Sequence, residues 1–245
     1  FMKIEMNRLH SFILLVAASS LLFQLPSEAF AIDPYDIAII DRVTDGSEFP
    51  NLGTAHSVDV FMIDSRLYAI VTGHEDDGVQ IIDITDPYNI TATDAENDGV
   101  NGFTELSDVT DVATFTIGGS TYAITVAEKL GGGEADGVQI IDIIDPTNIV
   151  AIDAEKDDVN GFDVLSGAFG VDTFTIGSKT YAIVAASYAN PVLGGVQMID
   201  ISNPADIVAV DSETHDVNGF DMIAGARDVE TFTIGSSTYA IVTSN

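Results

Sequence analysis

The sequence contains no cysteine and no tryptophan, and it has few basic residues. The 245-residue chain carries 8 Lys and Arg against 39 Asp and Glu, which gives a formal net charge of −31. The absence of cysteine excludes disulfide bonds, thiolate metal sites and a cysteine nucleophile. The shortage of basic residues argues against nucleic acid and anionic membranes as partners, because both require cationic contacts. Since 46% of the residues are hydrophobic, the chain is expected to form a core rather than a disordered acidic segment.

One apolar segment near the N-terminus predicts targeting. Residues 11–25 are apolar and follow Arg8, and residues 29–31 read Ala-Phe-Ala, the small-x-small pattern of a signal-peptide cleavage site. We therefore expect residues 1–31 to be a signal peptide. The mature chain, 32–245, would then be secreted, extracellular or at the cell surface, with the periplasm as an alternative. The apolar stretch is too short to predict a membrane span.

One short sequence recurs three times and organises the rest of the chain. Asp-Gly-Val-Gln-Ile-Ile-Asp-Ile begins at Asp77 and again at Asp136, about 59 residues later, and a variant of it begins at Gly195. A fixed period of this size predicts a repeat architecture. We place a closing strand and a first partial repeat at 33–76, and the repeats themselves at about 77–135, 136–194 and 195–245.

Each repeat is expected to contain four short strands. In the copy that is easiest to follow, β-branched and aromatic residues mark strands at 171–176, 180–185, 195–201 and 207–210. The third strand is apolar on both faces, as in sheets that are covered on both sides. No segment has a sustained helical period, so the mature chain is predicted to be all-β. Four antiparallel strands per repeat are typical of the blades of a β-propeller.

The sequence Gly-Val-Gln-Ile-Ile-Asp-Ile-x-Asp-Pro-x-Asn-Ile resembles the signature of the LVIVD-type repeat family, secreted or cell-surface β-propellers of bacteria and archaea. The likeness covers essentially all of residues 33–245. It implies an all-β propeller with four-stranded blades of about 59 residues, and it implies no particular activity. The rival fold is a β-solenoid, whose repeat units are usually shorter.

The two ends of the chain predict an incomplete ring. Residues 33–41 match 86–90, which lead into a fourth strand, so the chain is expected to begin with an outermost strand. Residues 227–243 supply only the first two strands of a further blade. Because propellers have about 4–8 blades, we expect a gene fragment whose complete ring is larger. A four-bladed ring that lacks one strand is the alternative. Whole blades are predicted at about 58–94, 111–153 and 170–211.

The long acidic loops are expected to gather on one rim, where function often resides. Residues 94–105 match the spacing of a calcium-binding loop, with a glycine at position 6. The candidate ligands are Asp94, Glu96, Asp98, Val100 and Glu105. Strands rather than helices flank this motif, and its copies in the later repeats lack part of the pattern. The preferred alternative is therefore a solvated acidic turn that keeps blade edges from pairing with other chains.

Two other groups of polar residues are expected to be structural. The histidines His56, His74 and His215 occupy different positions in the repeats, so no histidine cluster is predicted. An aspartate recurs inside the apolar third strand, and buried carboxylates require partners. We expect these aspartates to accept bonds from neighbouring backbone or hydroxyl groups; they are Asp83, Asp142 and Asp200.

We interpret the chain as a secreted or cell-surface β-propeller that serves as a non-catalytic binding or scaffold module. Calcium is the candidate stabilising ion, and a protein or glycan is the expected ligand of the acidic loop face. One alternative is a propeller enzyme, a hydrolase or lyase, whose site lies in the central channel or in blades outside this sequence. A second is an adhesin or filament subunit. The likeness of the copies argues against an enzyme, because an active site requires one blade to depart from the others.

Overall fold

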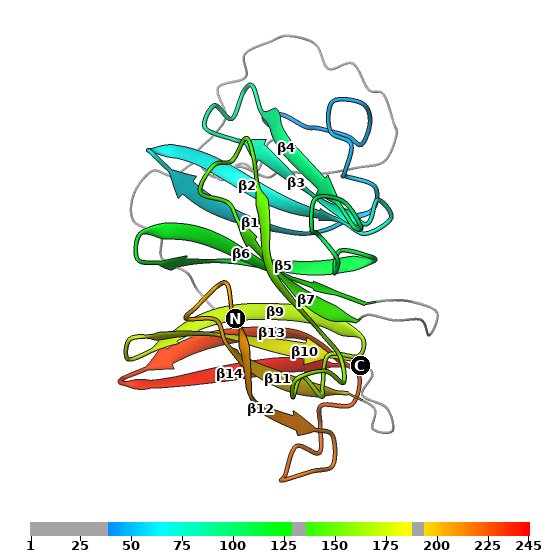
Figure 1. The fold of residues 1–245 in the computed structure, drawn as a ribbon, viewed down its shortest axis with the longest axis vertical. Coiled ribbons are helices and arrows are strands. Elements are labelled where there is room, and N and C mark those ends of the chain that lie inside the picture. The colour runs from blue at the N-terminus through cyan, green and yellow to red at the C-terminus, as the bar shows by residue number, and fades with distance from the viewer. Residues whose placement is uncertain (1–38, 129–135, 188–193) are drawn as a thin grey trace.

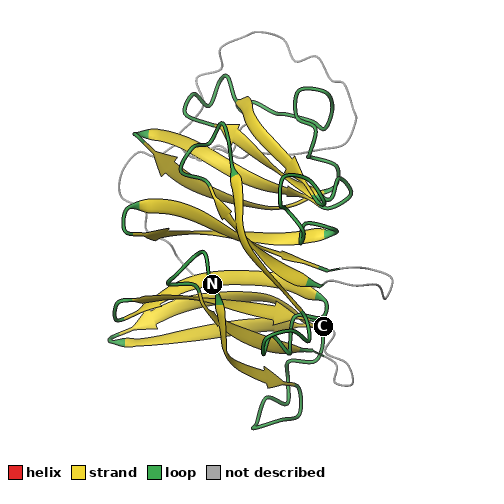
Figure 2. Ribbon diagram, in the orientation of Figure 1, coloured by secondary structure: helices red, strands yellow, loops and turns green. Residues whose placement is uncertain are grey.

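A computed structural model describes residues 39–128, 136–187 and 194–245 (Figure 1). These residues form β-strands joined by turns and loops, and no helix occurs among them (Figure 2). Within the described ranges there is consequently no helix long and apolar enough to cross a membrane. The predicted signal peptide, 1–31, lies outside the described residues.

The strands form three four-stranded sheets and one hairpin, each sheet with its strands in chain order. The first sheet contains β1 (Ala55–Ile63), β2 (Arg66–Gly73), β3 (Gly78–Asp83) and β4 (Thr91–Asn97). The second contains β5 (Val109–Ile117), β6 (Ser120–Ala127), β7 (Gly137–Asp142) and β8 (Val150–Lys156). The third contains β9 (Ala168–Ile176), β10 (Lys179–Ala186), β11 (Gly195–Asp200) and β12 (Val208–Thr214). The hairpin consists of β13 (Ala226–Ile234) and β14 (Ser237–Ser244). The predicted all-β fold, with four-stranded antiparallel blades and an incomplete ring, is confirmed.

Each second strand pairs with its third strand in the same register. The tyrosine of the second strand faces the aspartate of the third in all three complete blades, as in Tyr68 with Asp83 and Tyr122 with Asp142. These aspartates accept hydrogen bonds from backbone N–H groups two residues later, such as Thr85 N on Asp83 and Ile144 N on Asp142. The expected structural role of this aspartate is therefore confirmed.

Neighbouring sheets meet mainly through their first strands, β1, β5, β9 and β13. Figure 1 shows the sheets face to face in chain order, with the first strands running through the middle of the assembly. Sheets that touch along one edge and diverge towards the other are arranged as the blades of a propeller. The first strands therefore lie beside the central axis.

The core lies between the blades rather than within any one of them. Phe115 and Ile124 of the second blade belong to one buried cluster with Phe162 and Leu165, which belong to the loop leading into the third. In each blade a phenylalanine of the first strand stacks on the tyrosine of the second, with ring centroids about 5.5–5.7 Å apart. The Phe and Tyr of one blade face the next blade, so every complete contact buries a stacked pair.

A carboxylate in the middle of the fourth strand joins the first blade to the second and the second blade to the third. Asp94 Oδ2 accepts a hydrogen bond from Ile149 N at 2.7 Å, and Asp153 Oδ2 accepts one from Ile207 N at 2.8 Å. Asp41 Oδ2 makes the equivalent bond to Ile90 N at 3.2 Å. Asp41 therefore occupies the place of this aspartate in a preceding blade.

Candidate active site

The first strands differ from one another next to the axis, although the blades are otherwise alike. A valine is common to all four strands, at Val58, Val112, Val171 and Val229. The residue before this valine differs in each blade: Ser57, Asp111, Gly170 and Asp228. The residue after it differs as well: Asp59, Ala113, Asp172 and Glu230. The blades thus depart from one another at the positions that lie beside the axis.

All of these residues except Gly170 line a pocket of about 330 Å³ between the first strands. A volume of this size is at the lower end of the range for small-molecule sites. Carboxylates dominate the polar lining, and they come from four different blades: Asp59, Asp111, Asp172, Asp228 and Glu230. The structure therefore brings together carboxylates that the repeat pattern left dispersed.

Asp111 is half-buried in the pocket and accepts three hydrogen bonds. Its Oδ1 accepts hydrogen bonds from the Ser57 hydroxyl and from Val112 N, and its Oδ2 accepts one from Val171 N at 2.8 Å. Burial raises the pKa of Asp111, these hydrogen bonds oppose the rise, and the nearby charge of Asp228 adds to it, so that the pKa lies above its ordinary value. Because a hydroxyl can accept as well as donate, Ser57 can also serve the protonated form of Asp111.

Asp59 and Asp172 are tied to the first strand of the following blade. Asp59 Oδ2 accepts hydrogen bonds from Thr114 N at 2.6 Å and from the Thr114 hydroxyl at 2.7 Å. Asp172 Oδ2 accepts the same pair of bonds from Thr231. The second blade has Ala113 at this position and uses Asp111 for its bond to the next strand. Asp59 and Asp172 therefore fix the spacing of the strands around the pocket.

Asp228 and Glu230 have oxygens left for a ligand. Asp228 Oδ1 accepts a hydrogen bond from Val229 N at 2.9 Å, and within the described ranges its Oδ2 accepts none. Glu230 is exposed and has no hydrogen-bond partner among the described residues. The pocket thus combines a half-buried carboxyl of raised pKa with carboxylates that are open to solvent.

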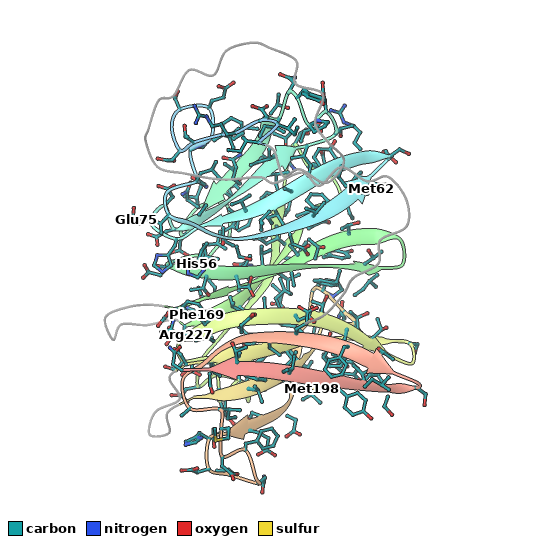
Figure 3. The ribbon with its side chains drawn as sticks, turned by 180° about the vertical axis from the view of Figure 1, so that it is seen from behind. His56, Met62, Glu75, Phe169, Met198 and Arg227 are labelled. Carbon is teal, nitrogen blue, oxygen red and sulfur yellow. The ribbon has the colours of Figure 1, made fainter. Side chains whose placement is uncertain are left out.

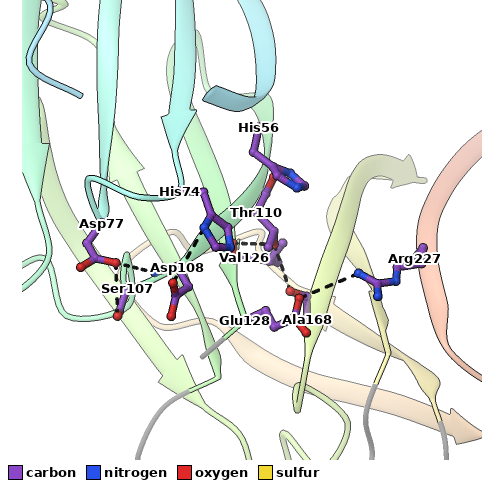
Figure 4. A network of polar contacts seen from close by, with 10 residues as sticks. All are labelled: His56, His74, Asp77, Ser107, Asp108, Thr110, Val126, Glu128, Ala168 and Arg227. Carbon is purple, nitrogen blue, oxygen red and sulfur yellow. Dashed lines mark hydrogen bonds and ion pairs between the residues drawn. The ribbon is translucent and has the colours of Figure 1, made fainter. Parts of the chain in front are cut away.

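Aromatic and cationic side chains surround one end of the axis (Figure 4). His56 Nδ1 donates to the carbonyl of Thr110 at 2.7 Å, and the ring centroids of His56 and His74 lie 5.7 Å apart. Phe169 meets His56 edge-on at 5.1 Å, and the guanidinium of Arg227 lies 4.2 Å from the centroid of the Phe169 ring. Figure 3 shows His56, Phe169 and Arg227 along the same side of the molecule.

The expectation that the histidines would form no cluster is wrong for His56 and His74. It compared positions within the repeat, whereas the start of a first strand and the loop after a second strand lie side by side on the same rim. His215 is separate, with its Nε2 3.3 Å from Asp216. Successive antiparallel strands run in opposite directions, so the start of a first strand lies beside the end of the second. This alternation could have placed His56 beside His74 from the sequence.

The candidate calcium ligands have partners within the protein. Asp94 joins two blades, as described above, and both oxygens of Glu96 lie 3.0 Å from Asn101 Nδ2. Asp98 Oδ1 accepts a hydrogen bond from Leu106 N at 3.1 Å. The later copies repeat these contacts, as Asp157 Oδ1 does with Leu165 N at 2.7 Å. The acidic pattern thus shapes the loop in successive blades.

The last two candidate ligands lie elsewhere. The carbonyl of Val100 accepts a hydrogen bond from Phe103 N at 2.9 Å. The side chain of Glu105 is fully buried, with its Oε1 3.2 Å from Lys156 Nζ, and burial raises its pKa even though Lys156 lowers it. Among the described residues, no group of three or more His, Cys, Asp or Glu side chains is arranged to hold a metal ion. Calcium binding by residues 94–105 stays a prediction.

No protein-family model matches the chain, and no curated protein matches it. Several solved structures are similar to it. An α-L-arabinofuranosidase from Lactobacillus brevis is 10% identical with a TM-score of 0.46, and the match covers 76% of this chain and 63% of the enzyme. An endo-arabinase from Bacteroides thetaiotaomicron is 11% identical with a TM-score of 0.45, covering 79% and 66%. A β-fructofuranosidase from Bombyx mori is 16% identical with a TM-score of 0.44, covering 66% and 38%. The chain thus spans from about two fifths to two thirds of the lengths of these proteins.

The expectation of a non-catalytic binding or scaffold module is corrected. The expectation depended on the likeness of the blades, which holds for the outer strands and fails beside the axis. The departure that an active site requires is present in the described part of the ring, at Asp111, Asp228 and Glu230.

Proposed function

We propose that this chain forms part of a propeller enzyme that hydrolyses glycosidic bonds in neutral sugars, with the central pocket as its active site. The observation that carries the proposal is Asp111, a half-buried carboxyl of raised pKa in the same pocket as the open carboxylate of Asp228. Glycoside hydrolysis uses one protonated and one ionised carboxyl group. Two carboxyl groups in different environments have different pKa values and can fill these two roles.

The charge of the pocket supports a neutral substrate. The lining offers carboxylate acceptors from four blades, and the chain as a whole has a net charge of −31. Phosphorylated or carboxylated substrates would be repelled from such a site. Sugar hydroxyls are donors, so a neutral sugar matches a pocket that is rich in acceptors.

In this mechanism Asp111 gives its proton to the oxygen of the leaving group. Asp228 acts on the opposite side as the ionised carboxylate, either activating water or attacking the sugar carbon. Ser57 holds Asp111 in position by its hydroxyl, and Asp59 and Asp172 hold the first strands at their spacing through Thr114 and Thr231. The carboxyl groups of Asp111 and Asp228 are the residues that would touch the substrate.

Hydrolysis of a panel of neutral 4-nitrophenyl glycosides tests this proposal. We expect release of nitrophenol by the parent chain, and a loss of about 100-fold or more in kcat/KM for Asp111→Asn and for Asp228→Asn. Asp163→Asn is the matched control, because the Asp163 side chain is exposed and lies outside the pocket. An inactive parent, or Asp111→Asn and Asp163→Asn variants of equal activity, would contradict the proposal.

We also propose that the protein is secreted and that it belongs to the LVIVD-type repeat family, because of the apolar segment 11–25 and the repeated Gly-Val-Gln-Ile-Ile-Asp-Ile sequence. Mass spectrometry of protein recovered from the culture medium tests secretion. A mature chain that begins at Ile32 is the expected result. A chain that retains residues 1–31 would contradict it.

A further inference from the structure

Gly170 interrupts a series of side chains that link neighbouring first strands at the position before the shared valine. In β1 the Ser57 hydroxyl donates a hydrogen bond to the Asp111 carboxylate of β5, and Asp111 in turn accepts one from Val171 N of β9. At this position β9 has a glycine, Gly170, and β13 again has an aspartate, Asp228. The contact between β9 and β13 at this level therefore contains no side chain from β9.

The backbone of β13 occupies the space that a side chain at residue 170 would need. A Cβ atom at Gly170 would lie 2.8 Å from the carbonyl oxygen of Arg227, 2.8 Å from the Cα atom of Asp228 and 3.3 Å from Asp228 Oδ1. The first two contacts are with backbone atoms, so no change of rotamer relieves them. Glycine is therefore required here for the close approach of the two strands.

Contacts on both sides of Gly170 hold β13 against β9. On the N-terminal side, the guanidinium of Arg227 lies 4.2 Å from the centroid of the Phe169 ring (Figure 3). On the C-terminal side, Thr231 donates its backbone N–H and its hydroxyl to Asp172 Oδ2. Because the two strands are joined at both points, a side chain at residue 170 is expected to displace the segment of β13 between them.

We propose that Gly170 is a positioning residue for the site: by leaving room for the backbone of β13, it places the Asp228 carboxylate in the pocket that Asp111 also lines. This inference rests on the proposed function, in which these two carboxyl groups act as a pair. The separation of such a pair decides its chemistry, since about 5–5.5 Å suits direct attack on the sugar and about 6.5–9.5 Å leaves room for water. A displacement of Asp228 by about 1 Å is enough to lower the rate about 100-fold.

Gly170→Ala tests the position of Asp228 without a substrate. Burial is the main cause of the raised pKa of Asp111, and the charge of Asp228 adds to it. We expect the pKa of Asp111, measured by NMR titration of the carboxyl carbons, to fall in Gly170→Ala and in Asp228→Asn, and to fall no further when the two changes are combined. These variants leave unchanged the other ionisable side chains that line the pocket, Asp59, Asp172 and Glu230.

Gly195→Ala is the matched control. A Cβ atom at Gly195 would lie 2.6 Å from the carbonyl oxygen of Glu213, so this variant introduces a backbone clash in the same blade at a residue outside the pocket. It should leave the pKa of Asp111 unchanged. Equal falls in the two glycine variants, no fall in Gly170→Ala, or a further fall in the combined variant would each overturn the proposal.

Thr231→Ala provides a second test if Gly170→Ala does not fold. It removes the hydroxyl bond to Asp172 and so loosens β13 from β9 without adding a side chain at residue 170. The pKa of Asp111 should again fall, and it should not respond to Thr231→Ala when Asp228 is already asparagine. An unchanged pKa, or a fall that persists in the Asp228→Asn background, would overturn the proposal.

Activity separates this inference from the proposed function. With a 4-nitrophenyl glycoside that the parent hydrolyses, Gly170→Ala should lower kcat by about 100-fold with little change in KM, because Asp228 is still present but misplaced. A rise in KM with unchanged kcat would overturn the positioning role. An inactive parent would overturn the proposed function alone, because the titration decides the role of Gly170 without substrate.

Discussion

At the scale of single residues, the function of a carboxylate in this protein depends on which backbone group reaches it. Asp59 and Asp172 accept bonds from a threonine of the next blade and serve to space the strands. Asp111 is enclosed, and its pKa is raised by burial and by Asp228. Asp83 is a third case. Burial raises its pKa, but hydrogen bonds from Thr85 and Arg66 outweigh burial, so the pKa of Asp83 lies below its ordinary value.

Asp111 predicts a pH dependence of stability that its amide variant lacks. A carboxyl whose pKa is raised in the folded state stabilises the fold below its unfolded pKa, and this contribution is lost as the pH rises through the folded pKa. The free energy of unfolding of the parent, relative to that of Asp111→Asn, should therefore fall as the pH rises from about 4, the ordinary pKa of an aspartate, towards neutrality. Urea titrations at a series of pH values measure this difference. A difference that rises over the same interval would contradict the assigned pKa direction.

Glu105 and Lys156 form a blade-specific pair that predicts a double-mutant result. Both side chains lie beside the glycine that begins the third strand. In the first blade the equivalent positions are Asn51 and Asn97, whose side chains are joined by a hydrogen bond of 3.2 Å. Lys156→Thr removes the cation that lies beside the buried Glu105 carboxyl and should cost about 2 kcal/mol, less than for a fully buried pair because Lys156 is itself 46% exposed.

The second change should restore stability. The third blade has Val164 and Thr214 at these positions, so Glu105→Val combined with Lys156→Thr converts one natural pair into another. We expect the double variant to unfold within about 1 kcal/mol of the parent, by urea denaturation. A double variant as unstable as Lys156→Thr would show that the two positions are not coupled.

At the scale of elements, the acidic loops serve mainly to connect and shape blades. The aspartate at the first position of the loop motif reaches the backbone of the following blade in two copies, from Asp94 to Ile149 and from Asp153 to Ile207. The glutamate two residues later holds an asparagine of left-handed backbone, such as Asn101 with φ 50°. The acidic residues of these loops thus have structural roles, although in the sequence alone the same residues also match a calcium-binding pattern.

Asp153→Ala should destabilise the protein by about 1–2 kcal/mol, because it leaves Ile207 N without its partner between two packed blades. Asp211→Ala is the matched control. Asp211 occupies the same position, and within the described residues it accepts only the bond from Ser212 N, which has its equivalent at Asp153 in Ala154 N. Urea denaturation of the two variants measures the difference. Equal effects would show that the bond between blades contributes nothing.

The fold could be predicted from the sequence to a greater extent than the pocket. Strands were recognisable because residues such as Val79 and Ile82 recur at a fixed period and are buried in each complete blade. The pocket depends on single positions, such as Ser57 beside Asp111, that lie about 54 residues apart and carry no shared pattern. An alignment that looks only for residues shared between the repeats overlooks these positions. A comparison of the residues that differ between the first strands would have indicated the pocket.

At the scale of the whole molecule, calcium provides a direct test of the loop motif at residues 94–105. We expect calcium and magnesium at equal millimolar concentrations to shift the Tm equally, through screening of the net charge of −31. Differential scanning calorimetry measures both shifts. A rise with calcium that exceeds the rise with magnesium, and that is lost in Asp98→Asn, would establish a specific calcium site and contradict this expectation.

The stacked rings and the aspartate bonds between blades run in one direction along the chain. Each blade presents a stacked Phe and Tyr on one side, and on the other it offers the backbone N–H groups that carboxylates of the preceding blade reach. Such a head-to-tail contact involves only two neighbouring blades, so it does not by itself fix the number of blades in the ring. How many blades make a closed circle is then decided by the wedge angle between successive sheets, and a change at the axis that altered this angle would alter the number.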